Sequence, residues 1–258
     1  MATRRALLLI ADIGGYTEYM QAHRSILGHA EAVTTRMLGK VVDAARDFDL
    51  IEIEGDAAFL SREADGLDGP ATLAAITDAA VAMHRAFHAQ RRLVELNMCP
   101  CVSCTQTSDL KLKFVAHVGE VAFQKVKKFT ELAGVDVILV HRLLKNSVPI
   151  SEYVLMSDAL HQELAPSLGT EANQLDEDLE GIGPQRTFYV ELDTLAGPHE
   201  VTVTPSFFGK LAGWLRMTWR TIPYLLGAKK SCDGFRNMDM VLEPGKVRPS
   251  AMLPPKME

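Results

Sequence analysis

The sequence predicts an α+β fold of the ferredoxin-like βαββαβ type, in which helices cover one side of a mostly antiparallel sheet. Two observations predict it. Segments with a helical period of apolar residues alternate along the chain with short segments typical of strands. Hydrophobic residues make up 47% of the 258 residues, which is enough to bury a full core. We expect residues 1–195 to form this domain, and residues 196–258 to form an amphipathic helix and a partly extended tail.

The first half of the chain predicts a strand, a long helix, a two-stranded hairpin and a second long helix, in this order. An apolar run from Leu7 to Ala11, closed by Asp12 and two glycines, predicts a core strand that ends in a tight turn. Residues 29–46 carry apolar side chains at a helical period, and residues 71–96 predict a second helix. Between them, residues 50–60 predict a hairpin whose turn holds Gly55 and Asp56.

The second half predicts further strands around one more helix. Residues 110–119 alternate apolar residues with lysines, which predicts a strand, and residues 121–126 are expected to be its hairpin partner. Residues 135–146 predict a helix, and residues 153–156 and 187–192 predict two more strands.

Two aspartates are the candidate metal ligands. A hairpin at Asp56 can place its carboxylate beside Asp12 at the end of the first strand, and two such carboxylates can hold two Mg²⁺ or Mn²⁺ ions for displacement at phosphorus. A glycine-rich turn leading into a helix offers backbone N–H donors to phosphates. The alternative interpretations are that Asp12 caps a helix beginning near Thr17, and that Asp56 is an ordinary turn residue.

These segments resemble a known family. The motif Ala-Asp-Ile-Gly-Gly-Tyr-Thr followed by Glu-Gly-Asp-Ala resembles the catalytic core of class III nucleotide cyclases, and of a divergent bacterial group of unknown function within it. The resemblance includes a central strand with a His-x-Gly-Glu turn at residues 111–121, then residues 134–142 and 181–190. It therefore covers residues 7–190 in the family's order, and implies that residues 1–195 form a cyclase-like domain.

The resemblance implies a purine nucleoside triphosphate as ligand and a role for individual residues. Asp12, Asp56 and the Ile13 carbonyl would hold the metals. The backbone of the turn would bind the phosphates through Gly14, Gly15, Tyr16 and Thr17.

Three further residues correspond to base-binding and catalytic positions of the family. Glu52 and Glu131 would contact the base, and a glutamate at position 52 suits guanine because it accepts hydrogen bonds from N1–H and the 2-amino group. Glu52 can equally be a solvent-facing strand residue. Arg142 would stabilise the transition state from the second subunit of a homodimer, or be an ordinary exposed arginine.

Two positions depart from the family pattern. Ile138 stands where the family usually has an asparagine that orients the ribose, and Ile182 stands where some members carry a lysine. Whether the chain is an enzyme therefore stays open. The alternative to a cyclase is a catalytically degenerate fold that senses a nucleotide or another ligand, or contacts a protein.

Cysteines and the C-terminal segment supply separate candidates. Cys99, Cys101 and Cys104 are spaced for a zinc or redox site, with Cys232, His84 or His88 as a further ligand, or are plain reduced thiols. Residues 206–226 mix aromatic, aliphatic and basic side chains, which suits either docking on protein or peripheral membrane contact.

Charge and hydropathy limit the partners and the compartment. The net charge of −6 and a single short basic run argue against nucleic-acid binding. Without a visible signal peptide or membrane span, the expected location is the cytoplasm.

Overall fold

A computed structural model describes residues 3–24, 27–97, 106–126 and 129–196, and a few positions between 215 and 228. The chain divides into two compact units. The first comprises Met1–Gly14, Lys40–Ala86 and Lys111–His199, and the second comprises Gly15–Gly39, Phe87–Leu110 and Glu200–Glu258. Within the described ranges, no helix has both the length and the apolar character that crossing a membrane requires.

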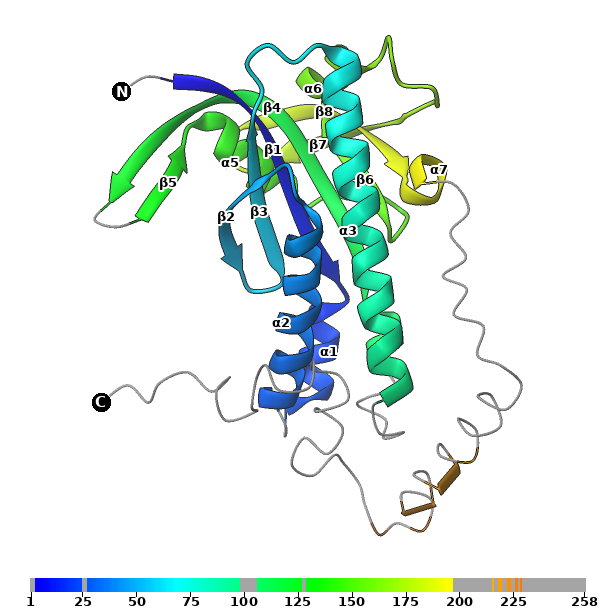
Figure 1. Ribbon diagram of the computed structural model, residues 1–258. Coiled ribbons are helices and arrows are strands. Elements are labelled where there is room, and N and C mark those ends of the chain that lie inside the picture. The colour runs from blue at the N-terminus through cyan, green and yellow to red at the C-terminus, as the bar shows by residue number, and fades with distance from the viewer. Residues whose placement is uncertain are drawn as a thin grey trace. The chain divides into compact units, whose positions relative to one another are not determined.

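The first unit contains an eight-stranded sheet (Figure 1). Its strands follow the order β2 (Asp49–Glu54), β3 (Ala57–Glu63), β1 (Thr3–Gly14), β4 (Lys111–Val126), β6 (Tyr153–Ser157), β8 (Gly183–Glu191) and β7 (Asn173–Leu179), and β5 (Phe129–Ala133) pairs with β4. Every neighbouring pair is antiparallel except β4 and β6. The predicted α+β fold with a mostly antiparallel sheet is confirmed.

The core of this unit is built around β1, because its residues from Ala6 to Ala11 are all buried. Leu8 and Ile10 share a hydrophobic cluster with Val115 of β4 and with Val140 of α5 (Val135–Arg142). Helix α6 (Asp158–Leu164) packs against β4, β6 and β8, and α7 (Leu192–Ala196) packs against β8. A strand buried along its whole centre can hold a charged end residue in a fixed place.

The two long predicted helices are confirmed as α2 (Leu27–Ala44) and α3 (Gly69–Asn97). In the part of α3 that belongs to the first unit, Ile76, Ala80 and Met83 are buried, as their helical spacing predicts. The second unit also contains α1 (Tyr16–Ala22) and a 3₁₀ helix, η2 (Gln106–Asp109). There Tyr19 is buried and its hydroxyl accepts a hydrogen bond from Thr107.

One predicted hairpin is wrong. Residues 110–119 and 121–126 do not pair with each other, because they belong to the single strand β4, and the hairpin partner is β5. The His-x-Gly-Glu segment is therefore not a turn. Gly119 lies inside β4, where a Cβ would come within 2.3 Å of the Asp136 side chain, so the glycine makes room for a contact with α5.

Other differences concern the ends of elements. Helix α5 ends at Arg142 and not at residue 146, and the last predicted strand is β8, which begins at Gly183. The strand β7 was not predicted. Its sequence, Asn-Gln-Leu-Asp-Glu-Asp-Leu, has little apolar content because it forms the edge of the sheet and is mostly exposed.

Candidate active site

The sheet brings the two predicted metal carboxylates together. Asp12 lies near the end of β1 and pairs in register with Ala57 of β3, the residue directly after Asp56. The N–H of Ile13 donates a hydrogen bond to the carbonyl of Asp56 at 3.2 Å, which ties the β2–β3 turn to the end of β1. The hairpin therefore places Asp56 beside Asp12, as the sequence predicts.

The surroundings of Asp56, including Asp12, raise its pKa. Burial, and then the negative charge and side chain of Asp12, raise the pKa of Asp56 from 3.8 to about 6. Backbone hydrogen bonding and the Lys113 charge oppose this rise without cancelling it. A divalent cation would offset the charge of Asp12 that disfavours ionisation of Asp56, so these two carboxylates fit a metal of the Mg²⁺ or Mn²⁺ class.

Lys113 is a member of this cluster that the sequence interpretation missed. It lies on β4 directly opposite Asp12, and its Nζ is 3.0 Å from Asp12 Oδ2. Burial is the largest single influence and would lower the pKa of the Lys113 ammonium, but the charge and hydrogen bond of Asp12, with the charges of Tyr153 and Asp56, together outweigh burial and raise the pKa. Lys113 therefore stays positively charged at neutral pH.

The turn after β1 leads directly into α1. Gly15 is the N-cap residue of α1, has a left-handed conformation with φ of 82°, and provides no side-chain cap. The alternative in which Asp12 caps this helix is therefore wrong. Gly14 ends β1, and Tyr16 and Thr17 begin α1, so the predicted phosphate-binding residues are consecutive across the strand–helix junction.

The two predicted base-binding glutamates line one cavity. This cavity, of about 330 Å³, is formed by residues of β2, β3, β5 and α5: Ile51, Glu52, Phe59, Glu131, Leu132, Val137 and His141. The His141 and Phe59 rings meet in a T-shaped arrangement with their centroids 4.8 Å apart. His141 Nδ1 is 3.7 Å from Glu54 Oε2. Apolar walls with a few polar groups at the rim are typical of small-molecule sites.

Helix α5 presents an exposed face beside this cavity. Val135 and Ile138 are 71% and 53% exposed, and Arg142 follows one turn later on the same face. Arg142 forms an ion pair with Glu180 at 3.0 Å. The ion pair that the structure gives this arginine is therefore with the β7–β8 turn and not with the carboxylate cluster.

A second polar cluster joins α5 to the sheet. The buried His117 of β4 has Nδ1 2.7 Å from Ser157 Oγ and Nε2 3.1 Å from Asp136 Oδ1. The other oxygen of Asp136 accepts the backbone N–H of Glu120 at 2.7 Å. Burial lowers the pKa of His117, and Asp136 partly opposes this effect. This cluster holds the first turn of α5 against β4.

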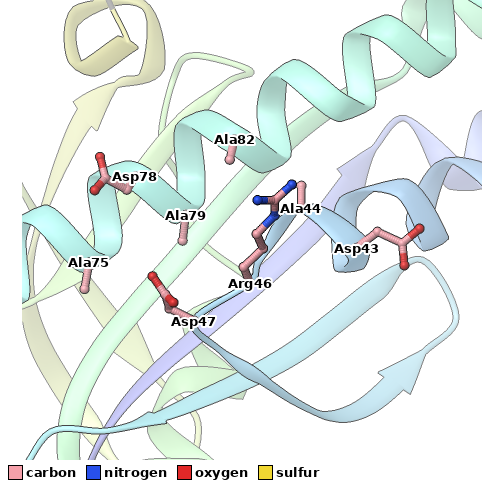
Figure 2. Close-up of a pocket in the computed structure, with 8 residues that line it drawn as sticks. All are labelled: Asp43, Ala44, Arg46, Asp47, Ala75, Asp78, Ala79 and Ala82. Atoms are coloured by element: carbon pink, nitrogen blue, oxygen red, sulfur yellow. The ribbon is translucent and has the colours of Figure 1, made fainter.

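Figure 2 shows a different hollow of the first unit, of about 350 Å³. Alanines of α3 form one wall, and Arg46 and Asp47, which follow α2, lie opposite (Figure 2). Asp43, Asp47 and Asp78 are exposed, and Asp47 is also 4.0 Å from Arg62. None of these residues was predicted to bind a ligand. Because the two hollows have similar volumes, chemistry and not size favours the cavity with Glu52 and Glu131.

Some predictions concern residues outside the described ranges. Cys99, Cys101, Cys104 and Cys232 belong to this group, so the zinc or redox site stays a prediction. Of residues 206–226 only a few are described, and among them Leu215, Trp219, Ile222 and Leu226 are exposed. Peripheral membrane contact through this segment also stays a prediction.

The amino-acid sequence is similar to a family model and to a mycobacterial protein. Residues 34–153 match a family model described as "Protein of unknown function (DUF2652)". A Mycobacterium tuberculosis protein named "Uncharacterized protein Rv2561/Rv2562" is 45% identical over 204 residues, which cover 79% of this chain and 93% of that protein.

The fold is similar to that of nucleotide cyclases. The guanylate cyclase domain of RhGC from Catenaria anguillulae, solved in complex with GTP, aligns with a TM-score of 0.54 and 15% identity over 74% of this chain and 98% of that domain. The guanylyl cyclase Cya2 aligns with a TM-score of 0.51 and 16% identity, over 78% of this chain and 96% of that chain. A bacterial light-regulated adenylyl cyclase aligns with a TM-score of 0.55 and 10% identity, over 85% of this chain and 58% of that chain. At these identities the likeness shows a common fold.

Proposed function

Because this chain belongs to the family of the mycobacterial protein Rv2561/Rv2562 and has the fold of a class III nucleotide cyclase catalytic domain, we propose that it binds a purine nucleoside triphosphate with two divalent cations and forms a 3′,5′-cyclic nucleotide. One observation carries the proposal: Asp12 and Asp56 lie together, and burial followed by the charge of Asp12 raises the pKa of Asp56 to about 6. Carboxylates with perturbed pKa values are characteristic of functional sites, and paired carboxylates suit divalent cations.

The metals would be held by the side chains of Asp12 and Asp56 and by the carbonyl of Ile13. Bound Mg²⁺ or Mn²⁺ supplies Lewis-acid activation of the ribose hydroxyl and neutralises phosphate charge. The turn residues Gly14 and Gly15, with Tyr16 and Thr17, follow directly on β1, and their backbone N–H groups would bind the β- and γ-phosphates.

In the proposed reaction the ribose 3′-oxygen forms a bond to the α-phosphorus while the bond from that phosphorus to the β-phosphate oxygen breaks. Pyrophosphate leaves with the bonding electrons, and the hydroxyl proton passes to solvent. Negative charge grows on the transferring phosphoryl group, so a guanidinium stabilises the transition state. Arg142 would supply it from a second copy of the chain.

The cavity with Glu52 and Glu131 favours guanine as the base. Both carboxylates accept hydrogen bonds, and guanine offers N1–H and a 2-amino group as donors. Adenine presents an unprotonated N1 at the same edge, which a carboxylate would repel. We therefore propose GTP as the preferred nucleotide.

A homodimer is part of the proposal because of the exposed face of α5. Val135 and Ile138 expose apolar side chains next to Arg142, and covering them with a second copy would bury apolar surface. The ion pair of Arg142 with Glu180 is exposed, so it costs little to exchange for a phosphate.

Ile138 also favours a second candidate function. Where a cyclase would use an asparagine to orient the ribose, this chain has a half-exposed hydrocarbon side chain that forms no hydrogen bond. A site with intact carboxylates and without ribose support would bind a metal–nucleotide complex and respond to it without turnover. This alternative makes the protein a nucleotide sensor.

Incubation of the purified protein with each nucleoside triphosphate and Mn²⁺, followed by mass spectrometry of the products, separates the candidates. A cyclic nucleotide formed by the wild type and not by Asp56→Asn supports the cyclase and identifies its base. Metal-dependent nucleotide binding without product supports the sensor. A product that persists in Asp56→Asn, or the absence of binding, contradicts both.

For the dimer, an equimolar mixture of Asp56→Asn and Arg142→Ala is informative. Activity restored by mixing two inactive variants would support a site shared between chains, because one of the two mixed sites then has all its residues. A mixture as inactive as its components would contradict the shared site.

A further inference from the structure

Lys113 gives the carboxylate cluster a positive charge of its own. In the register of β1 and β4 it stands directly opposite Asp12, and its Nζ lies 3.0 Å from Asp12 Oδ2. The Lys113 and Asp12 side chains are only 23% and 16% exposed. Since water screens this pair poorly, its electrostatic interaction is stronger than that of a surface ion pair.

The position of the ammonium matters for any cation that approaches Asp12. Asp12 Oδ2, which a divalent cation would bind, is in contact with Lys113 Nζ, so the two positive charges compete for one oxygen. Asp12 and Asp56 together carry at most two negative charges, which one ammonium and one divalent cation already exceed. The cluster alone is therefore a poor site for free metal ions.

A triphosphate changes this charge balance. Its roughly four negative charges offset two divalent cations, and an ammonium on a flexible four-carbon side chain can turn from Asp12 toward a phosphate without leaving the cluster.

We propose that Lys113 is a tethered counter-ion that competes with divalent cations for Asp12 and makes metal binding conditional on the triphosphate. The ligand that the site selects is then the metal–nucleoside triphosphate complex, and the free metal ion is rejected. This inference rests on the proposed function, since it assumes that Asp12 and Asp56 are the metal ligands.

Lys113→Met tests the inference by removing the charge and keeping the length of the side chain. Titration calorimetry with Mn²⁺ alone, and separately with Mn²⁺ and GTP, gives two affinities for each protein. For Lys113→Met we expect binding of Mn²⁺ alone to tighten about tenfold, because the competing charge is gone. Binding of the Mn²⁺–GTP complex should weaken, because the same charge no longer offsets phosphate.

Lys111→Met is the matched control. Lys111 lies two residues earlier on the same strand, opposite Gly14, so the substitution removes the same charge outside the carboxylate cluster. It should leave both affinities near those of the wild type. Lys113→Arg keeps the charge and should also reject free Mn²⁺, and circular dichroism of every variant confirms that it folds.

The outcomes separate the inference from the proposed function. If the wild type binds Mn²⁺–GTP while Lys113→Met and the wild type bind free Mn²⁺ equally, the inference is wrong and the proposed function stands. If neither protein binds Mn²⁺–GTP, the proposed function fails and the inference fails with it. Opposite changes in the two affinities, confined to position 113, would support it.

Discussion

Two polar clusters lie on the same face of the sheet along the contact between β1 and β4, one near the end of the paired region and the other near its middle. The carboxylate cluster contains Asp12, Asp56 and Lys113, and the helix-docking cluster contains His117, Asp136 and Ser157. In the register of the two strands, Asp12 opposes Lys113 and Leu8 opposes His117, with Ile10 opposing Val115 between them. The same β scaffold therefore supports both.

The clusters differ in how completely their groups are partnered. In the helix-docking cluster each Asp136 oxygen faces a partner, either His117 or the Glu120 N–H, and His117 also meets Ser157. In the carboxylate cluster, Asp12 and Asp56 have the one ammonium of Lys113 between them, and the pKa of Asp56 is raised to about 6. The contacts of Asp136 join α5 to β4, whereas two carboxylates beside one ammonium leave a net negative charge that suits a cationic ligand.

Gly119→Ala is expected to have the largest effect on stability, because it breaks the helix-docking cluster. The new Cβ would lie 2.3 Å from Asp136, so this carboxylate would have to leave His117 and the Glu120 N–H. We expect a loss of about 3 kcal/mol in the free energy of unfolding, measured by urea denaturation.

The control for this prediction is Gly169→Ala. Gly169 has nothing within 4 Å of an added Cβ, so its substitution should change stability by less than about 0.5 kcal/mol. Equal effects at positions 119 and 169 would show that Asp136 is not docked as described.

Asp56→Asn should have an intermediate effect of the opposite sign, and this effect should depend on pH. Because the pKa of Asp56 is raised from 3.8 to about 6, its ionised form destabilises the folded protein above pH 6. At pH 8 the variant should be more stable than the wild type by about 2 kcal/mol. The difference should shrink as the pH falls through 6, where the folded protein takes up the proton.

Urea denaturation at intervals from pH 8 to pH 4 measures this difference. Asp65→Asn, in the exposed loop after β3, is the control and should behave like the wild type throughout. A difference that stayed constant over this range would mean that burial and the charge of Asp12 do not raise the pKa of Asp56.

Arg142→Ala should have the smallest effect on stability, because its ion pair lies outside both clusters. The side chains of Arg142 and Glu180 are exposed, so the loss should be below about 0.5 kcal/mol in thermal denaturation. Glu180→Ala should be equally mild and should keep any nucleotide turnover, whereas Arg142→Ala should lose it. Equal turnover in both variants would remove Arg142 from the proposed mechanism.

Only part of the carboxylate cluster could be predicted from the sequence. Asp12 and Asp56 each follow a local signal, since a strand ends in Asp-Ile-Gly-Gly at one place and a Gly-Asp turn joins two strands at the other. Lys113 has no such signal, because alternating lysines on a strand usually face solvent. Only the pairing of β1 with β4, which joins residues far apart in the chain, places it against Asp12.

Gly119 shows why the strand pairing was less predictable than the strands. A glycine in an alternating segment suggests a turn, and the contact that explains it comes from Asp136 on a helix later in the chain. Similarly, the sequence of β7 is polar and does not indicate a strand, but the segment forms one because it pairs with β8. Local patterns predict elements, but long-range contacts decide which elements pair.

The proposed function depends most on whether the carboxylate cluster holds divalent cations beside a triphosphate. Anomalous X-ray scattering from crystals grown with Mn²⁺ and a non-reactive GTP analogue would locate the metals directly. We predict anomalous peaks at the carboxylates of Asp12 and Asp56, with the base in the cavity of Glu52 and Glu131. Ordered nucleotide elsewhere on the protein, with no anomalous peak at these two carboxylates, would contradict the account.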